Sequence, residues 1–237
     1  MKILLTGYGR MGQFVEQIAT QRGHEVIGHV DVNNVPDLET LPAADVVIDF
    51  SHPSMLDALG AYVKRTGTAL VSGTTGYQAE HMAKLQELAG FAPVLHSANY
   101  SLGVAMFKYL LQQLPAQLKE SFDIEILEKH HNKKVDAPSG TAKMLLDAID
   151  PDHEKKVVTG RDGMCGARTK DEIGVMALRG GTVAGEHTVY LFGEDETLSI
   201  THSAASRRIF AVGAVQAAEK MVGKEKGYYL LDQILFS

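Results

Sequence analysis

The first hundred residues alternate between short apolar runs and stretches in which apolar residues recur at helical spacing. A short apolar run predicts a strand, and the helical spacing predicts a helix. Because strand and helix alternate throughout, the pattern predicts a doubly wound α/β fold with a parallel sheet. The expected strands are residues 2–6, 25–30, 45–50, 69–72 and 93–96.

The pattern changes after Phe122. A strand-like run at 122–127 precedes a helical pattern at 142–149, and three further strand-like runs then follow without intervening helices, at 173–179, 187–192 and 197–201. This predicts a second α+β domain with a mainly antiparallel sheet. The polar, Gly-rich residues 153–169 are expected to form a loop. Residues 101–114 and 206–221 have helical spacing, and the tail to residue 237 is apolar enough to dock.

Composition excludes several classes of protein. The 237 residues are 45% hydrophobic with a net charge of −6, and acids and bases are mixed along the chain. A nucleic-acid-binding protein would show a basic stripe, so no nucleic-acid partner is expected. No apolar run reaches the length of a membrane span, and the start of the chain enters a strand without signal-peptide character. With one cysteine, Cys165, which we expect to be inert, the chain is expected to be cytoplasmic.

A glycine pattern follows the first strand. The six residues from Gly7 to Gly12 read G-x-G-x-x-G and precede a helix, and Asp31 ends the second strand nineteen residues after Gly12. In this context the pattern predicts a dinucleotide-binding fold. Gly7 would permit the tight turn, Gly9 would let the pyrophosphate approach the backbone, and Gly12 would let helix and strand pack closely. The expected cofactor-binding residues here are Gly7, Tyr8, Gly9, Arg10, Met11, Gly12 and Asp31.

Two more loops follow the ends of expected strands, where ligands bind in such sheets. They are expected to line the cofactor cleft through Gly73, Thr74, Thr75, Ala98, Asn99, Tyr100 and Ser101. Read alone, Thr74 and Thr75 fit an ordinary turn with capping hydroxyls equally well.

The stretch from Glu128 to Ala142, EKHHNKKVDAPSGTA, concentrates chemical groups between a strand and a helix. Its adjacent histidines can exchange a proton near neutral pH, and its adjacent lysines add positive charge. Residues 139–141 precede the helix, so their N–H groups are suited to bind a carboxylate. Each residue alone could be a cap or a solvated side chain. Together they predict a site for an anionic small molecule that is protonated during reaction.

This stretch resembles the signature of the dihydrodipicolinate reductases, also called hydroxy-tetrahydrodipicolinate reductases, of lysine synthesis. The matching residues are Glu128, His130, His131, Lys134, Asp136, Pro138, Ser139, Gly140 and Thr141. The resemblance covers almost the whole chain. It implies a dinucleotide-binding domain formed by residues 1–100 and 206–237, and a substrate-binding and oligomerisation domain formed by residues 101–205. It further implies that NADH or NADPH reduces a cyclic imine dicarboxylate, in a homotetramer assembled through the second sheet.

The resemblance also implies roles for individual residues. His130 is expected to be the acid, with Lys134 assisting in catalysis and binding. His131, Lys134, Ser139, Gly140 and Thr141 are expected to bind the substrate, while Asp136 orients the loop. The residues alone do not choose between Lys133 and Lys134; the family spacing favours Lys134.

Several alternatives stay open. Arg207 and Arg208 could each approach the cofactor, and His96 is expected to be packed beside a cofactor loop. Asp31 disfavours a 2′-phosphate and no basic residue follows it, although Asn33 and Asn34 could donate to one; NADH is expected to serve at least as well as NADPH. Two other functions compete with this one: a redox-sensing regulator and a reductase of another oxo acid.

Overall fold

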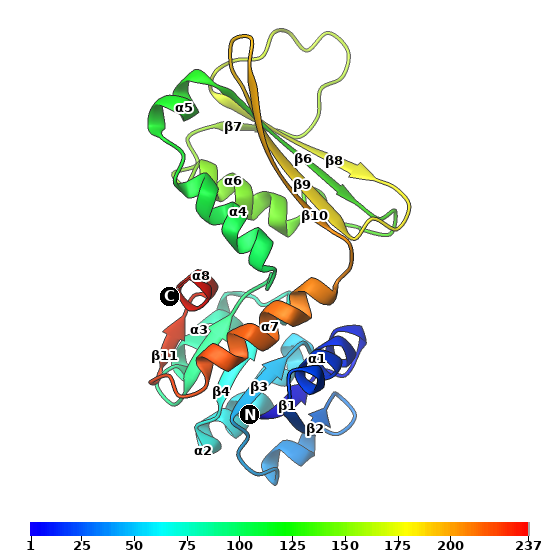
Figure 1. The fold of residues 1–237 in the computed structure, drawn as a ribbon, viewed down its shortest axis with the longest axis vertical. Coiled ribbons are helices and arrows are strands. Elements are labelled where there is room, and N and C mark those ends of the chain that lie inside the picture. The colour runs from blue at the N-terminus through cyan, green and yellow to red at the C-terminus, as the bar shows by residue number, and fades with distance from the viewer. Residues whose placement is uncertain (237) are drawn as a thin grey trace. The chain divides into compact units, whose positions relative to one another are not determined.

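The computed structural model describes residues 1–236, and within them the chain forms two compact units. The first comprises Met1–Leu102 together with the C-terminal stretch that begins at Arg208, and the second comprises Gly103–Arg207. The sequence placed these boundaries after residues 100 and 205. The chain thus leaves the first unit once and returns to it, as can be followed by colour in Figure 1.

The first unit is built on a six-stranded sheet in the order β11-β5-β4-β3-β1-β2, in which every pairing is parallel. The strands are β1 (Lys2–Thr6), β2 (Glu25–Val30), β3 (Val46–Asp49), β4 (Ala69–Ser72), β5 (Pro93–His96) and β11 (Gly227–Tyr229). The helices are α1 (Arg10–Gln21), η1 (Val35–Glu39), η2 (Pro53–Met55), α2 (Leu56–Thr66), α3 (Ala79–Leu88), α7 (Arg208–Met221) and α8 (Leu231–Leu235). The predicted doubly wound parallel sheet is confirmed.

Helices cover both faces of this sheet. All residues of β3 and β4 are buried, which explains why their sequences are apolar without alternation. One face packs against α1, α7 and α8, and the other packs against α2 and α3. The tail was predicted to dock, but β11 itself was not predicted. It is three residues long and is defined by pairing with β5 rather than by any pattern of its own.

The second unit contains a five-stranded sheet in the order β10-β9-β6-β8-β7. Its strands are β6 (Asp123–His130), β7 (Lys156–Val158), β8 (Glu172–Arg179), β9 (Gly185–Phe192) and β10 (Thr197–Ala204), and its helices are α4 (Leu102–Gln112), α5 (Ala116–Ser121) and α6 (Gly140–Ile149). The sheet is mixed. The expected antiparallel arrangement holds for β10-β9-β6, whereas β8 runs parallel to both β6 and β7.

The reason is the crossover through α6. The chain leaves β6, passes through that helix, and enters β7 and β8 in the original direction, as parallel pairing requires. Burial alternates strictly along β6, whose buried face carries Ile124 and Ile126 in its first half and Glu128 and His130 in its second. Helices α4 and α6 pack on that face and complete the core of the unit (Figure 1).

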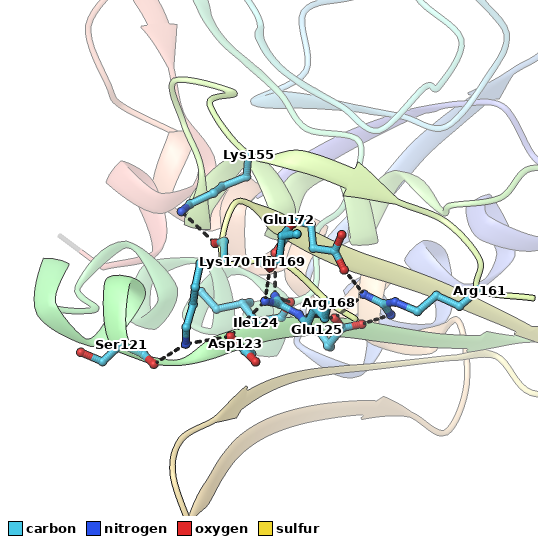
Figure 2. Close-up of polar contacts among 10 residues, drawn as sticks. All are labelled: Ser121, Asp123, Ile124, Glu125, Lys155, Arg161, Arg168, Thr169, Lys170 and Glu172. Atoms are coloured by element: carbon cyan, nitrogen blue, oxygen red, sulfur yellow. Dashed lines mark hydrogen bonds and ion pairs between the residues drawn. The ribbon is translucent and has the colours of Figure 1, made fainter. Parts of the chain in front are cut away.

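A long loop between β7 and β8 is held to the sheet by charged side chains, as Figure 2 shows. Arg161 donates to both oxygens of Glu125 and to Glu172, each at 2.9 Å, and Arg168 donates to Glu125 at 3.1 Å. Burial raises the pKa of Glu125, but these two guanidinium groups outweigh it and lower the pKa overall. Glu125 lies across from Gly174 in the parallel strand, where any side chain would collide with the carboxylate.

In the described part of the chain, no helix is both long enough and apolar enough to cross a membrane.

Candidate functional site

The loop after β1 has the shape that its three glycines predict. Gly7 has a φ of +82°, and a side chain there would collide with the carbonyl of Phe50. A side chain at Gly12 would collide with the carbonyl of Gly7, so helix and strand pack closely at this point. Gly9 is different, because a Cβ there would meet nothing within 4 Å. The backbone before α1 is therefore open to a ligand, as a pyrophosphate would require.

The other residues of this loop have separate surroundings. Arg10 is exposed at the start of α1, while Met11 is half-buried against the core. The Tyr8 hydroxyl donates to Glu16, and its ring lies 3.9 Å from that of His29, centroid to centroid. That hydrogen bond to Glu16 raises the pKa of Tyr8.

Asp31 directly follows β2 and begins a tight local turn. Its carboxylate accepts from the backbone N–H of Asn33 at 2.7 Å, and within residues 1–236 no other group hydrogen-bonds to this carboxylate. The Asn34 amide already donates to the His29 carbonyl and to Asp37, so it is committed to the turn. Val32 is 63% exposed. The edge beside Asp31 therefore offers a carboxylate and an exposed apolar residue rather than a cation.

The loop after β4 is held in place by contacts with its neighbours in the sheet. A side chain at Gly73 would collide with the Phe50 ring. Thr74 is buried, and its hydroxyl donates to Asp49 at 2.8 Å and accepts from the N–H of Ser51 at 2.9 Å. Thr75 is exposed. Thr75 is thus placed to meet a ligand, while the side chain of Thr74 holds the loop.

The loop after β5 likewise contains both exposed residues and buried residues that hold it in place. Ala98 is exposed, and the side-chain oxygen of Asn99 accepts from the N–H of Ser101 at 2.9 Å. Tyr100 and Ser101 are buried, and the Tyr100 hydroxyl donates to the Ser72 carbonyl at 2.8 Å. Tyr100 therefore supports the loop with its side chain. The glycine loop, the carboxylate after β2 and the open loops after β4 and β5 together fit a nicotinamide dinucleotide.

In the second unit, the buried carboxylate of Glu128 is the centre of the candidate site. Arg179 binds it with two hydrogen bonds of 2.8 Å, one to each oxygen, and the N–H of Ser139 donates to it at 3.1 Å. Burial raises the pKa of Glu128, but hydrogen bonds from Arg179 and His130 lower it overall. The group is therefore an ionised acceptor despite full burial.

His130 ends β6 with its imidazole against Glu128. Its Nδ1 lies 2.5 Å from Glu128 Oε2. Since an ionised carboxylate only accepts, Nδ1 carries a hydrogen, and Nε2 is the nitrogen that can exchange a proton with a ligand. This arrangement suits a general acid whose orientation is fixed by a third group.

His187 lies beside this pair, with its ring 5.1 Å from that of His130 in an edge-on arrangement. The Ser139 hydroxyl accepts from the N–H of Ala142 at 3.1 Å and lies 2.9 Å from His187 Nε2. A hydroxyl has one hydrogen and two lone pairs, so this bond is compatible with either neutral tautomer of His187. Burial lowers the pKa of His187, which favours the neutral ring, and both polar groups of Ser139 are used within the protein.

Positive charge gathers on the loop after β6. Lys134 pairs with Asp136 at 2.7 Å and is less exposed than Lys133. Burial lowers the pKa of His131, and so do the charges of Arg207, His130 and Lys134. A ligand with carboxylates would find compensating charge here.

Helix α6 begins at Gly140, with Ser139 as its N-cap. Gly140 is exposed, and a Cβ there would meet nothing within 4 Å. Thr141 is half-buried in the first turn. The first N–H groups of a helix lack partners within it and attract anions, so this end is suited to a carboxylate.

Three residues of this cluster were missed as site residues by the sequence reasoning. Glu128 was part of the motif but was given no role, and Arg179 and His187 were noted only as strand residues. The register brings them together, because β6 pairs Glu128 with His187 on one side and His130 with Arg179 on the other. A charged residue ending a strand before Gly180 and Gly181 was the available signal for Arg179.

Comparison with protein families gives two matches that together span the chain. The model of the N-terminal part of dihydrodipicolinate reductase matches residues 1–100, and that of its C-terminal part matches residues 103–235. The 4-hydroxy-tetrahydrodipicolinate reductase of Staphylococcus carnosus is 45% identical over 243 residues, covering 99% of each chain. The protein of that name from Clostridium novyi is 39% identical over 251 residues, covering 100% of this chain and 98% of that one.

Solved structures agree on the fold. The dipicolinate-bound dihydrodipicolinate reductase from Paenisporosarcina sp. TG-14 matches with a TM-score of 0.77 and 22% identity over 99% of each chain. The DAP dehydrogenase of C. glutamicum in complex with DAP matches with a TM-score of 0.54 and 14% identity, covering 98% of this chain and 93% of that one. At these identities the likeness concerns the fold alone, a Rossmann-like parallel sheet followed by a second sheet.

His187 should make the protein sensitive to mild acid. Burial, and then the charge of His130, lower its pKa from 6.5 to about 4. Between these values the unfolded chain binds a proton that the folded chain does not, so stability falls as the pH drops through this window. We expect His187 to account for a loss of about 2 kcal/mol between pH 6.5 and 5. Urea unfolding at both pH values should show this loss reduced by that amount in His187→Gln. An equal loss in both proteins would mean that His187 does not titrate in this range.

Proposed function

The chain belongs to the dihydrodipicolinate reductase family, and on that premise we propose how its residues divide the work of the reaction. It reduces the cyclic imine dicarboxylate 4-hydroxy-tetrahydrodipicolinate to tetrahydrodipicolinate, in lysine and diaminopimelate biosynthesis. A reduced nicotinamide dinucleotide, when bound, supplies the hydride. The observation that carries the proposal is the imidazole of His130 held against the ionised Glu128, near Lys134 and the open start of α6.

His130 is the proton donor. Loss of the 4-hydroxyl group as water gives a conjugated imine, and hydride addition to that imine builds negative charge that must be met by a proton or a cation. Glu128 keeps a hydrogen on Nδ1 of His130, so Nε2 delivers the proton. Glu128 stabilises the charged ring without taking part in the transfer, because Arg179 holds it ionised.

Lys134, His131 and the start of α6 hold the two carboxylates. Gly140 lets one carboxylate approach the backbone, and the N–H groups of Gly140 and Thr141 bind it. Lys134 supplies charge for the other carboxylate, and His131 supplies a hydrogen-bond donor. Ser139 acts indirectly, since its hydroxyl caps α6 and its N–H holds Glu128.

The dinucleotide is held by the first unit. Gly7, Gly9 and Gly12 shape the pyrophosphate loop, which also includes Tyr8, Arg10 and Met11. Asp31 accepts from the ribose hydroxyls of the adenosine. The loops after β4 and β5 take the nicotinamide end, with Thr75, Ala98 and Asn99 facing the ligand and Gly73, Thr74, Tyr100 and Ser101 supporting them.

The proposal for His130 is tested by kinetics. His130→Gln should fold and keep its dinucleotide affinity, because the residue lies in the other unit. Its kcat should fall by roughly 10²–10⁴, as is typical when a general acid is removed. The assay follows NADH oxidation with synthase-generated substrate. A correctly folded variant with wild-type kcat would refute the assignment.

The adjacent lysines give the same assay an internal control. Lys134→Ala should lower kcat and raise KM, since it removes charge that faces the substrate. Lys133→Ala should change neither parameter, because Lys133 is exposed and lies outside the cluster. If kcat and KM changed only in Lys133→Ala, Lys133 rather than Lys134 would be the lysine that faces the substrate.

We propose that NADH serves at least as well as NADPH. A 2′-phosphate would meet Asp31 as a like charge, and residues 32–36 contain no lysine or arginine to offset it. With Asn34 committed to its turn, Asn33 is the amide left to meet a phosphate. The ratio of kcat/KM for the two cofactors at matched ionic strength tests this. Val32→Arg should move the ratio toward NADPH by about tenfold, the scale of one charge-assisted hydrogen bond. A wild-type preference for NADPH of roughly tenfold would contradict the proposal.

We further propose that the protein is a homotetramer assembled through the second sheet. Helices cover one face of that sheet, and the other face presents apolar side chains that include Leu178, Tyr190 and Phe192. Leu178 is 53% exposed and Phe192 41% exposed, and a large apolar patch is rarely left open to water.

Light scattering at micromolar concentration should give the mass of four subunits. Leu178→Asp should dissociate the assembly. The similarly exposed Leu198 lies opposite Leu191, whose side chain is in the helix-covered core, so Leu198→Asp serves as the matched control. A monomeric wild-type protein would refute this assembly.

A cytoplasmic location is also part of the proposal. The one cysteine, Cys165, is exposed and free, which suits a reducing compartment.

A further inference from the structure

A second buried carboxylate lies in the first unit, outside every motif discussed so far. Asp49 is the last residue of β3, and its side chain is fully buried. In the sheet order, β3 lies between β1 and β4. Asp49 pairs in register with Thr6 at the end of β1 and with Ser72 at the end of β4. It therefore sits where three adjacent strands end and their loops begin.

The carboxylate is surrounded by hydroxyl groups. Its oxygens accept hydrogen bonds from Thr6 Oγ1 at 2.8 Å, Ser51 Oγ at 2.5 Å, Ser51 N at 3.1 Å, Ser72 Oγ at 2.7 Å, Thr74 Oγ1 at 2.8 Å and, at 3.4 Å, Tyr77 OH. Within residues 1–236, no lysine, arginine or histidine side chain pairs with it. A buried carboxylate is tolerated when its lone pairs are all used, and here neutral donors use them.

These donors belong to different loops. Thr6 precedes the glycine loop, Ser51 follows β3, and Ser72 and Thr74 belong to the end of β4 and the loop after it. The loops are also tied to one another, because Thr74 Oγ1 accepts from the N–H of Ser51 at 2.9 Å.

The next strand is joined to the same network. The Thr74 carbonyl lies 3.0 Å from Nε2 of His96, which ends β5. A carbonyl only accepts, so Nε2 carries the hydrogen. The Ser72 carbonyl accepts from the Tyr100 hydroxyl at 2.8 Å. One carboxylate thus connects the loops that follow four neighbouring strands.

We propose that Asp49 is a positioning residue that sets the geometry of the dinucleotide-binding loops. The proposal rests on the cofactor site proposed above and deepens it. Asp49 is fully buried, so it acts through Thr6, Ser51, Ser72 and Thr74 rather than by touching the cofactor. A carboxylate is required because it accepts from every side and donates from none. An asparagine would present two N–H groups to hydroxyls and would reverse the bonds on one side.

The experiment measures dinucleotide binding in the full-length protein. Asp49→Asn keeps the shape, and its Kd for NADH and for NAD⁺ should rise by roughly tenfold or more. The KM for the imine substrate should be unchanged, because that substrate is assigned to the other unit. Val47→Ala is the control, since Val47 is buried in the same strand but lies outside the network. It should lower the melting temperature while leaving both Kd values as in the wild type.

Thr6 gives a second, isosteric test should Asp49→Asn fail to fold. Thr6→Val keeps the volume and deletes a hydroxyl that donates to Asp49, so it should weaken NADH binding. Thr6→Ser keeps the hydroxyl and should bind NADH as the wild type does. Amide hydrogen exchange at Ser51 should be faster in Thr6→Val than in Thr6→Ser, because the network that holds this N–H is loosened.

The outcomes separate the two proposals. A wild-type protein that binds no dinucleotide would overturn the cofactor site and this role together. A wild-type protein that binds NADH, with Kd values unchanged in Asp49→Asn or in Thr6→Val, would overturn the role of Asp49 alone. A matching loss of affinity in Val47→Ala would do the same, because it would make the effect one of stability. Loss of NAD⁺ affinity alone would also overturn it, since that would indicate direct action of the charge.

Discussion

The second unit depends on burying the charge of Glu128. A carboxylate removed from water is costly unless its oxygens are fully bonded, and a lost partner leaves an uncompensated charge. Three groups meet this demand for Glu128: Arg179 from β8, the N–H of Ser139 before α6, and His130 from β6, the strand of Glu128 itself. The same ion therefore fixes the parallel pairing of β6 with β8, the approach of α6 and the orientation of the acid.

The two units satisfy a buried carboxylate in different ways, and the difference fits their ligands. Glu128 is paired with the Arg179 guanidinium and Asp136 with the Lys134 ammonium, so neither carboxylate adds unpaired negative charge to the cluster. That balance suits a substrate with two carboxylates. Asp49 is bonded to neutral hydroxyls, so the loops around it gain order without gaining a cation. A fixed geometry without positive charge suits loops that must hold a nicotinamide, which becomes cationic as it loses its hydride.

Local features were predictable from sequence, and features that depend on register were not. The glycine loop, Asp31 and the HH…K…PSGT stretch are each contiguous or nearly so, and their geometry follows from the residues themselves. Arg179 and His187 join the site only because β6 pairs with β8 and β9 in one particular register. Asp49 looked like the end of an apolar run until β1 and β4 placed Thr6 and Ser72 beside it. Strands β7 and β11 are too short to show a period.

The cluster around Glu128 also gives two histidines, His130 and His187, different surroundings, although the side chains themselves are chemically identical. His130 contacts an ionised carboxylate, which fixes a hydrogen on Nδ1 and leaves Nε2 to exchange a proton. His187 contacts the Ser139 hydroxyl and is buried, and its pKa of about 4 keeps it neutral at physiological pH. Two charged rings 5.1 Å apart would repel each other. Keeping His187 neutral removes that repulsion and leaves His130 as the ring proposed to transfer the proton. Placing two titratable groups in opposed environments is how one site assigns acid chemistry to one of them.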